Sequence, residues 1–204
     1  LRDGGVESWL VEAIARIARN ADRSLDPYLL TVGEAKTLDR TSATCRCHFV
    51  LVDPQGTPRV PALTRMLSEQ VVDYCIPRRR IEAAIQRMGE TKSTDRLLQL
   101  QREARELFTT VANSGEGGEL LLYALLEVAL GLPQILCKMS LKTNAQVHYH
   151  GVDGVHAQAL PDGKLAVYWG EAKLYADVNA GIDAAMKSLA PFLLDDGTAQ
   201  RDVL

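Results

Sequence analysis

The chain has 204 residues, 47% of them hydrophobic, and a formal net charge of −3. This length and apolar content suffice for one or two packed domains, whereas no apolar run is long enough to span a membrane. The acidic balance argues against a protein that holds nucleic acid by bulk electrostatic attraction.

The charge is unevenly distributed along the chain. Residues from 115 onward contain 6 Lys/Arg and 11 Asp/Glu, a net −5, so the remainder carries +2. Four scattered cysteines and the lack of a signal peptide predict a reducing cytoplasm. Because the first residue is Leu and not Met, we also expect a fragment or a trimmed chain.

The first half predicts an α+β region rich in helices. Apolar residues recur at helical spacing in some segments, whereas others are short, β-branched and bounded by turn residues. The expected elements are helices over 6–21, 62–75, 78–88 and 94–111 and strands over 28–32 and 44–52. Pro77 separates two of the helices. No catalytic motif stands out in this half.

Basic residues gather in and just after the 78–88 helix: Arg78, Arg79, Arg80, Arg87, Lys92 and Arg96. Two interpretations apply. The arginines contact DNA, or they belong to the solvated face of a helix whose apolar residues turn inward.

The second half opens with an acidic, glycine-rich segment and an apolar helix over 120–132. Its expected boundaries are an N-cap at Ser114 and a stop at Gly131 and Pro133. Glu116 and Glu119 share one face at the helix start. The helix dipole favours both carboxylates. We assign that role to Glu116 and treat Glu119, flanked by leucines, as a candidate functional residue.

A strand over 134–139, a hairpin over 151–173 and a helix over 177–194 follow. The hairpin turn reads Leu160-Pro-Asp-Gly-Lys164. This sequence suits a three-residue loop with a left-handed glycine. Counting outward from the turn pairs Val155 with Trp169.

The same register places Asp153 opposite Glu171, with Lys173 further along the same face. Directly opposed carboxylates repel, and a divalent cation between them would turn the repulsion into coordination. Two carboxylates and a lysine at a strand end are what a Mg²⁺-dependent phosphodiester hydrolase needs. Alternatively, Asp153 caps a turn and Glu171-x-Lys173 is a solvated strand end, and a one-residue slip would move Asp153 to the other face.

The order of these elements resembles the PD-(D/E)xK nuclease superfamily over residues 113–194, with Glu119 on the helix and Asp153 and Glu171-x-Lys173 on the strands. Val152 stands where the superfamily commonly has Pro. Three blocks also resemble the HamA family of Hachiman anti-phage systems: Gly115-Glu-Gly-Gly-Glu-Leu-Leu-Leu-Tyr123, His150-Gly-Val-Asp-Gly-Val-His156 and Trp169-Gly-Glu-Ala-Lys-Leu-Tyr175. The resemblance implies an α+β fold, in which a nuclease core over 113–204 has a mixed sheet flanked by helices. It also implies that the region 1–112 docks onto a superfamily 2 helicase subunit, HamB.

The resemblance further implies Mg²⁺-dependent hydrolysis of DNA. Asp153 and Glu171 would hold the metal, with the backbone carbonyl of Ala172 as a further ligand. Glu119 would bind through water or complete a second metal position. Lys173 would orient the attacking water and stabilise the developing charge. Hard oxygen ligands favour Mg²⁺ or Mn²⁺ over Zn²⁺.

The tetrapeptide of this motif occurs a second time, as Gly33-Glu34-Ala35-Lys36. This copy has no aspartate strand at hairpin distance and no acidic helix before it. We therefore expect Glu34 and Lys36 to be ordinary surface residues.

Histidines and cysteines offer other sites. His148, His150 and His156 lie near Asp153 and form either a zinc site with it or the polar lining of a cleft, in which His150 and His156 contact DNA. Cys45 and Cys47 share a strand face with no second cysteine pair at zinc spacing. The remaining cysteines are expected in the core: Cys75 and Cys137.

The leading interpretation is a Mg²⁺-dependent DNase that acts as the effector of a defence complex and is restrained until its helicase partner meets DNA. One alternative is a non-catalytic scaffold or DNA-binding subunit with a nuclease fold, against which the intact motif argues. Another is a structure-selective, resolvase-like nuclease acting alone, against which the acidic balance argues.

Overall fold

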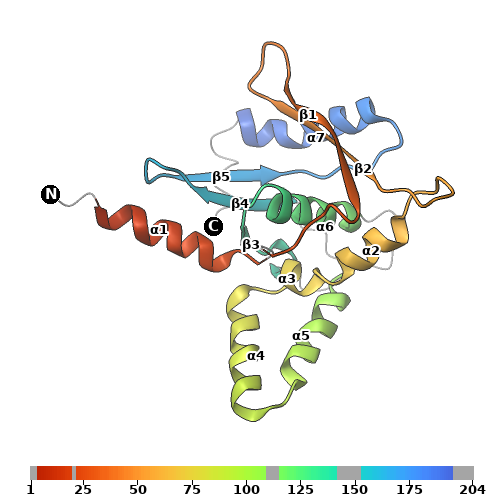
Figure 1. The fold of residues 1–204 in the computed structure, drawn as a ribbon. Coiled ribbons are helices and arrows are strands. Elements are labelled where there is room, and N and C mark those ends of the chain that lie inside the picture. Colours follow the sequence, from red (N-terminus) through yellow and green to blue (C-terminus); the bar gives the residue numbers. More distant parts are fainter. Residues whose placement is uncertain (1–3, 20–21, 109–114, 142–152, 195–204) are drawn as a thin grey trace.

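The structure is a computed structural model that describes residues 4–19, 22–108, 115–141 and 153–194 (Figure 1). The helices are α1 (Gly4–Ile17), α2 (Val60–Ser68), α3 (Val71–Cys75), α4 (Arg78–Thr91), α5 (Asp95–Glu106), α6 (Glu116–Ala124) and α7 (Val178–Leu194), with a π-helical turn η1 (Leu125–Ala129) and a 3₁₀ turn η2 (Lys138–Leu141). The strands are β1 (Leu29–Thr37), β2 (Thr44–Val50), β3 (Gln134–Leu136), β4 (Gly154–Ala159) and β5 (Leu165–Gly170). The expected α+β class is confirmed.

The strands form two sheets, β1–β2 and β3–β4–β5, and every described pair is antiparallel. The expected mixed sheet is therefore wrong for the described residues. The tight turn between β4 and β5 permits only an antiparallel pair, because parallel neighbours need a long crossover. The predicted hairpin register is confirmed, with Val155 opposite Trp169 and Gly163 in the left-handed region at φ +76°.

Two predicted helices differ in detail from the structure. The segment 62–75 is divided into α2 and α3, and between them the fully buried Gln70 donates its side-chain amide back to Met66 Sδ at 2.8 Å. The apolar helix has Gly115 as its N-cap, one residue after the expected position, and passes into η1. Ser114 lies outside the described residues. Gly131 has φ +63° and follows the helical segment, as predicted.

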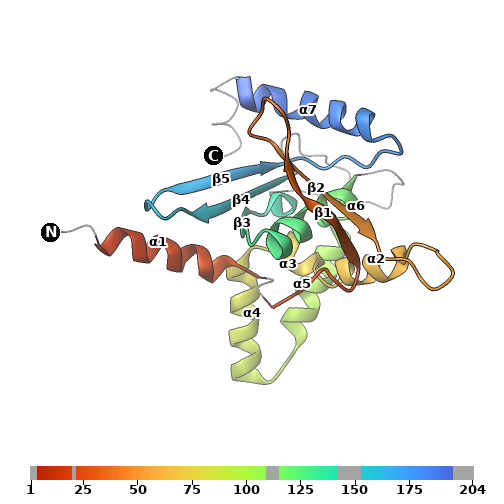
Figure 2. The ribbon, with the colours of Figure 1, turned by 45° about the horizontal axis from the view of Figure 1, so that its top comes forward.

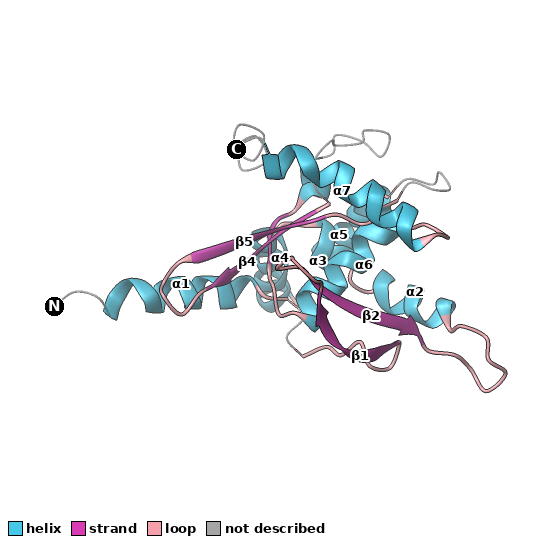
Figure 3. Ribbon diagram, turned by 90° about the horizontal axis from the view of Figure 1, so that it is seen from above, coloured by secondary structure: helices cyan, strands magenta, loops and turns pink. Residues whose placement is uncertain are grey.

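The helices lie on both sides of the β4–β5 hairpin. Figures 1 and 2 show α7 on one side and α3, α4 and α5 on the other. In the view from above, α1 and the hairpin extend in the same direction, and α1 contacts β4 (Figure 3). The helical pair α4–α5 projects from the rest of the molecule (Figure 1).

One cluster of buried residues runs from Leu25 to Met139. At its centre the rings of Tyr74 and Tyr123 lie 5.4 Å apart between centroids. Residues on both sides of position 112 therefore pack together, while the boundary between the regions 1–112 and 113–204 stays a prediction. Within the part of the chain described, no helix has the length and apolar character needed to cross a membrane.

Candidate active site

Asp153 and Glu171 lie just beyond the paired ends of β4 and β5. The last pair of the ladder is Gly154 with Gly170, and the Asp153 N–H still donates to the Gly170 carbonyl at 2.8 Å. The Asp153 carboxylate then accepts the Ala172 N–H at 2.8 Å. The two acidic residues thus belong to one strand end, but Asp153 is tied to the backbone of Ala172 and does not face Glu171 across a ladder pair.

Lys173 forms an ion pair with Glu171, whose side chain is only 6% exposed. Within this pair Lys173 Nζ donates a hydrogen bond to Glu171 Oε1, which raises the pKa of Lys173. The charges of Glu171 and Asp153 raise this pKa further. Lys173 therefore lies in the field of both carboxylates. An ammonium held charged in this position can stabilise negative charge on a bound phosphate.

A second lysine, Lys138 of η2, reaches the same site. Its Nζ lies 3.4 Å from Asp153 Oδ1, and both side chains are 12% exposed. No sequence motif marks this lysine, because it lies in the short segment after β3. Its position becomes evident only when β3 is paired with β4, which brings η2 next to the start of β4.

Glu119 is held by a residue from the other half of the chain. The hydroxyl of Tyr74, on α3, donates to Glu119 Oε2 at 2.9 Å. Burial, then the charge of Glu119 and its hydrogen bond, raise the pKa of Tyr74 strongly, and the charge of Asp153 adds to the effect. Tyr74 therefore stays protonated, bonds Glu119 and lies within electrostatic reach of Asp153. In the sequence, Tyr74 is marked only by its place in the helix expected over 62–75.

Two glycines allow α6 to approach the strand end. A Cβ on Gly118 would lie 3.1 Å from Leu174 Cγ and 3.5 Å from Ala172 Cβ. A Cβ on Gly170 would lie 2.9 Å from Leu122 Cδ2, closer than side chains tolerate. The bare backbone at both positions lets the helix that carries Glu119 lie directly against the segment 171–174.

Glu116 lies in the first turn of the same helix and is buried, with 2% of its surface exposed. A carboxylate that only interacts with the helix dipole does not need this burial. A carboxylate this deep at a helix N-terminus is favoured by the dipole and must be hydrogen-bonded. The assignment to a structural role is retained.

Glu171 and Lys173 open into a cleft of about 330 Å³ whose other wall is α7. Tyr175, Val178 and Ile182 line it and are exposed. Asp177 begins α7 by accepting the Ala180 N–H at 2.8 Å, as an N-cap does. Lys173, with 27% of its side chain exposed, is the member of the pair that a ligand can reach from this cleft, whereas Lys138 and Asp153 are each 12% exposed.

The prediction that His156 contacts DNA is wrong. This side chain is fully buried and its Nδ1 lies 2.7 Å from the Leu132 carbonyl, so it cannot contact DNA. Burial lowers its pKa. The error arose because β4 is the central strand of its sheet and is covered on both faces. His148 and His150 lie outside the described residues.

The predicted DNA-contacting arginines lie on α4, where Arg78 pairs with Glu82 and Arg80 with Glu103, and Arg79 is exposed. The structure does not bring them to the strand-end site. The interpretation as a solvated helix face fits Arg78, whose partner lies on the same helix.

The second tetrapeptide lies on the exposed part of β1, with Gly33 at φ +70° in an irregular stretch of the ladder. Glu34 and Lys36 are exposed, as predicted. Cys45 and Cys47 are exposed on β2, and the hydrogen bond with Cys45 raises the pKa of Cys47. Cys75 is buried, as predicted, whereas Cys137 is only half-buried.

The HamA family model matches residues 26–201, most of the chain. The chain belongs to the HamA family. HamA is a component of the Hachiman anti-phage defence system. Neither the comparison with curated proteins nor that with solved structures finds a match. The residues that match HamA include the whole candidate site, from Tyr74 on α3 to Lys173.

The donor set of this HamA-family chain fits Mg²⁺ in its chemistry. Asp153, Glu171, Glu119 and the carbonyl of Ala172 are hard oxygen donors, and Mg²⁺ is often held by one or two carboxylates plus substrate phosphates. Among the described residues, no group of three or more His, Cys, Asp or Glu side chains is arranged to hold a metal ion. The carboxylates instead contact Lys138, Lys173 and Tyr74. A metal would therefore have to replace an ammonium group at Asp153 or Glu171.

Proposed function

We propose that this HamA-family protein is a Mg²⁺-dependent nuclease of the PD-(D/E)xK type that hydrolyses DNA phosphodiesters. One observation carries the proposal: Asp153, Glu171 and Lys173 meet at the end of one hairpin, and Lys173 lies in the field of both carboxylates. Glu119 is directed to the same region by Tyr74. Charged groups with shifted pKa values that gather beside a cleft are more frequent at functional sites than elsewhere in a protein.

In this proposal Asp153 and Glu171 hold the metal, with the Ala172 carbonyl as a further donor and Glu119 as a ligand through water. Bound Mg²⁺ would supply neutralisation of the phosphate charge and a water of lowered pKa. Lys173 donates hydrogen bonds to the attacking water or the phosphate oxygen and stabilises the charge that develops there. Mn²⁺ replaces Mg²⁺ because it prefers the same oxygen ligands.

The proposed setting is an anti-phage complex in which the chain is the effector and a superfamily 2 helicase of the HamB type is the partner. The family supports the defence role. The acidic balance of the region from residue 115 onward, net −5, supports the need for help in reaching DNA. An unrestrained nuclease without sequence preference would also damage its host, so we place its activation under control of the partner.

Two substitutions test the proposal. Glu171→Gln removes one charge at nearly constant shape, and Lys173→Ala removes the ammonium, so each is expected to abolish Mg²⁺-dependent cleavage of plasmid and linear DNA. Cleavage is measured for the chain alone and with the helicase partner and ATP, and circular dichroism checks the fold. Glu34→Gln in the second tetrapeptide is the matched control and is expected to cleave like the wild type.

Full cleavage by both Glu171→Gln and Lys173→Ala would refute the assignment. An inactive Glu34→Gln variant would show that the wrong copy of the tetrapeptide was chosen. Absence of cleavage by the wild-type complex under all nucleotide and DNA-end conditions would refute the nuclease function as a whole.

One observation favours a second candidate, a non-catalytic scaffold with a nuclease fold. The carboxylates of the site contact side chains of the protein, and the described residues contain no arranged three-ligand group. The two candidates differ in metal binding. Calorimetric titration with Mn²⁺ should show a site that Asp153→Asn removes if the protein is a nuclease, and no such site if it is a scaffold.

A further inference from the structure

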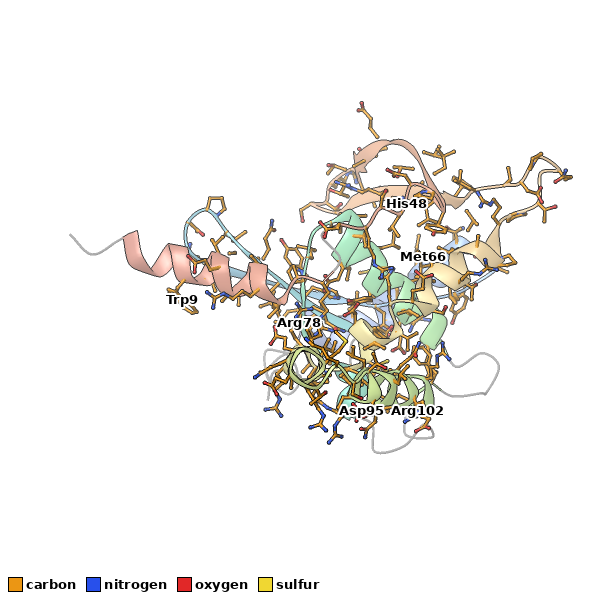
Figure 4. The ribbon with its side chains drawn as sticks, turned by 60° about the horizontal axis from the view of Figure 1, so that its bottom comes forward. Trp9, His48, Met66, Arg78, Asp95 and Arg102 are labelled. Atoms are coloured by element: carbon orange, nitrogen blue, oxygen red, sulfur yellow. The ribbon has the colours of Figure 1, made fainter. Side chains whose placement is uncertain are left out.

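The helices α4 and α5 enclose a cleft of about 270 Å³ away from the strand-end site. Three arginines line it: Arg80 and Arg87 from α4 and Arg96 from α5. Its floor is apolar, because Ala84 and Leu100 are buried there. Figure 4 views this part of the molecule, with Arg78 at the start of α4 and Asp95 and Arg102 on α5.

The arginines of the cleft are positioned by neighbours on the same helical pair. Arg80 forms a two-pronged ion pair with Glu103, with N–O distances of 2.5 and 2.7 Å, which ties α4 to α5. Arg96 donates to Gln99 Oε1 at 2.8 Å. The Asp95 carboxylate accepts hydrogen bonds from the Ser93 side chain and the Arg96 N–H, which lower its pKa. The positive charge of Arg87 lowers this pKa further. Glu103 offsets the charge of Arg80 and Asp95 offsets one of Arg87 and Arg96, so three arginines and two carboxylates leave the cleft with a net charge of +1.

The helical pair is also the basic part of an acidic protein. Residues 78–106 contain eight Lys/Arg and five Asp/Glu, a net +3, whereas the whole chain carries −3. The rest of the chain therefore carries −6. A polyanion approaching this protein is attracted to the projecting helical pair and repelled elsewhere.

We propose that the cleft between α4 and α5 binds phosphate groups of a nucleic acid backbone, through Arg87 and Arg96. This inference rests on the proposed nuclease function, which makes DNA the source of the phosphate. Guanidinium groups recognise phosphate oxygens through paired N–H donors. The apolar floor gives the stems of the arginine side chains a surface on which to pack.

The position of the cleft links it to the strand-end site. The helix α3 supplies Tyr74, which holds Glu119, and α4 begins three residues after α3 ends, at Arg78. Helix α5 packs against α3 as well. A DNA strand anchored on the helical pair is thus held by helices that pack against α3, which contacts the candidate catalytic Glu119 through Tyr74. Of the basic residues expected to contact DNA, the cleft gathers Arg80, Arg87 and Arg96, whereas Arg78 and Arg79 do not line it.

The test compares two double variants that each remove two positive charges. The variant Arg87→Gln with Arg96→Gln alters the cleft. The variant Arg102→Gln with Arg105→Gln alters positions of α5 outside it. Binding of a short fluorescent DNA by the full chain is measured by anisotropy in EDTA, so that cleavage does not contribute, over salt concentrations of about 50 to 200 mM.

The cleft variant is expected to bind about tenfold more weakly, and the slope of log K against log salt should become shallower by about 1 for each phosphate that the variant no longer binds. The control variant should bind less than about twofold more weakly at the same salt. Equal weakening in the two variants, unchanged binding in both, or no measurable DNA binding by the wild-type chain would overturn the proposal.

Calorimetry with inorganic phosphate separates a nucleic acid from a small anion. If the cleft variant fails to bind free phosphate while its DNA binding is unchanged, the cleft is a small-anion site and the proposal is overturned. Failure of this inference is distinguishable from failure of the nuclease function, because Glu171→Gln tests cleavage and leaves the helical pair unaltered.

Discussion

Replacing Lys138 by Met removes the charge that faces Asp153 while keeping most of the side-chain volume. Both side chains are 12% exposed, and Nζ lies 3.4 Å from Oδ1. In the metal-free protein, Asp153 would then keep the hydrogen bond from the Ala172 N–H and the more distant charge of Lys173. We expect the variant to be less stable than the wild type without metal and to be stabilised more by Mg²⁺.

The magnitude follows from the distance and the burial. At an effective dielectric constant of about 20, two charges 3.4 Å apart attract by about 5 kcal/mol before desolvation is subtracted. Removing one partner of a buried pair costs about 3–5 kcal/mol, and the bond from Ala172 favours the lower end. A destabilisation of about 3 kcal/mol corresponds to a fall in Tm of about 6–12 °C for a protein of this size.

The metal is expected to restore most of this stability. A ligand at about a hundred times its Kd stabilises the folded state by about 2.7 kcal/mol. Because Mg²⁺ no longer competes with an ammonium, its Kd should fall by about tenfold for each 1.4 kcal/mol of repulsion removed. Thermal unfolding is followed by circular dichroism with EDTA and with increasing Mg²⁺.

Lys164→Met is the matched control, because Lys164 pairs with Asp162 at the exposed hairpin turn, where solvent screens an ion pair and leaves it little effect on stability. If Lys138→Met is destabilised no more than this control, the Lys138–Asp153 pair does not have the energetic role assigned to it. If Mg²⁺ raises the Tm of the wild type and of Lys138→Met equally, Asp153 is not a metal ligand.

Three further substitutions test the packing and ionisation of the site. Gly170→Ala places a Cβ 2.9 Å from Leu122 Cδ2 and should lower the free energy of unfolding, measured in urea, by about 1–3 kcal/mol. Adding Leu122→Ala should restore part of this loss. An unchanged urea midpoint in Gly170→Ala would contradict the close approach of the two residues. Tyr74→Phe removes the 2.9 Å hydrogen bond to Glu119, so it should lower the free energy of unfolding by about 1–3 kcal/mol and weaken DNA cleavage. Wild-type stability together with wild-type cleavage would show that this hydrogen bond has neither role. Burial lowers the pKa of His156 in the folded protein, so the unfolded state binds the imidazole proton more readily. The free energy of unfolding should therefore fall as pH drops below about 6.5 towards the lowered native pKa. His156→Gln should flatten that part of the pH profile, and an unaltered slope would assign it to other groups.

The sequence was sufficient where local chemistry decides the outcome. The turn from Leu160 to Lys164 determines the hairpin register, since Pro161 and Gly163 restrict the loop to a few conformations. From that register the neighbourhood of Asp153 and Glu171 followed by counting. The end of the apolar helical segment at Gly131 was predictable for the same reason, because a left-handed residue stops a helix.

The remaining site residues depend on contacts between distant segments. Tyr74 meets Glu119 across 45 positions, and Lys138 meets Asp153 across 15. Neither pair has a spacing that a helix or a hairpin imposes, so only the packed core brings them together. Gly118 and Gly170 did carry a usable signal, since glycines within an apolar helix and at a strand end suggest close approach of two backbones.

The partners of the site carboxylates bear on how the protein is controlled. Asp153 contacts Lys138, Glu171 contacts Lys173, and Glu119 contacts Tyr74. These contacts reduce the repulsion among buried acids, so the fold does not require a metal, but they also compete with one. A DNA phosphate beside the site offers Lys173 another anion and gives a divalent cation further oxygen ligands. Metal and DNA binding then reinforce each other, because coupling between two ligands is reciprocal. If the protein is the nuclease proposed above, the site would bind metal weakly in isolation and would be completed by its substrate, so the protein would stay inactive until DNA is delivered.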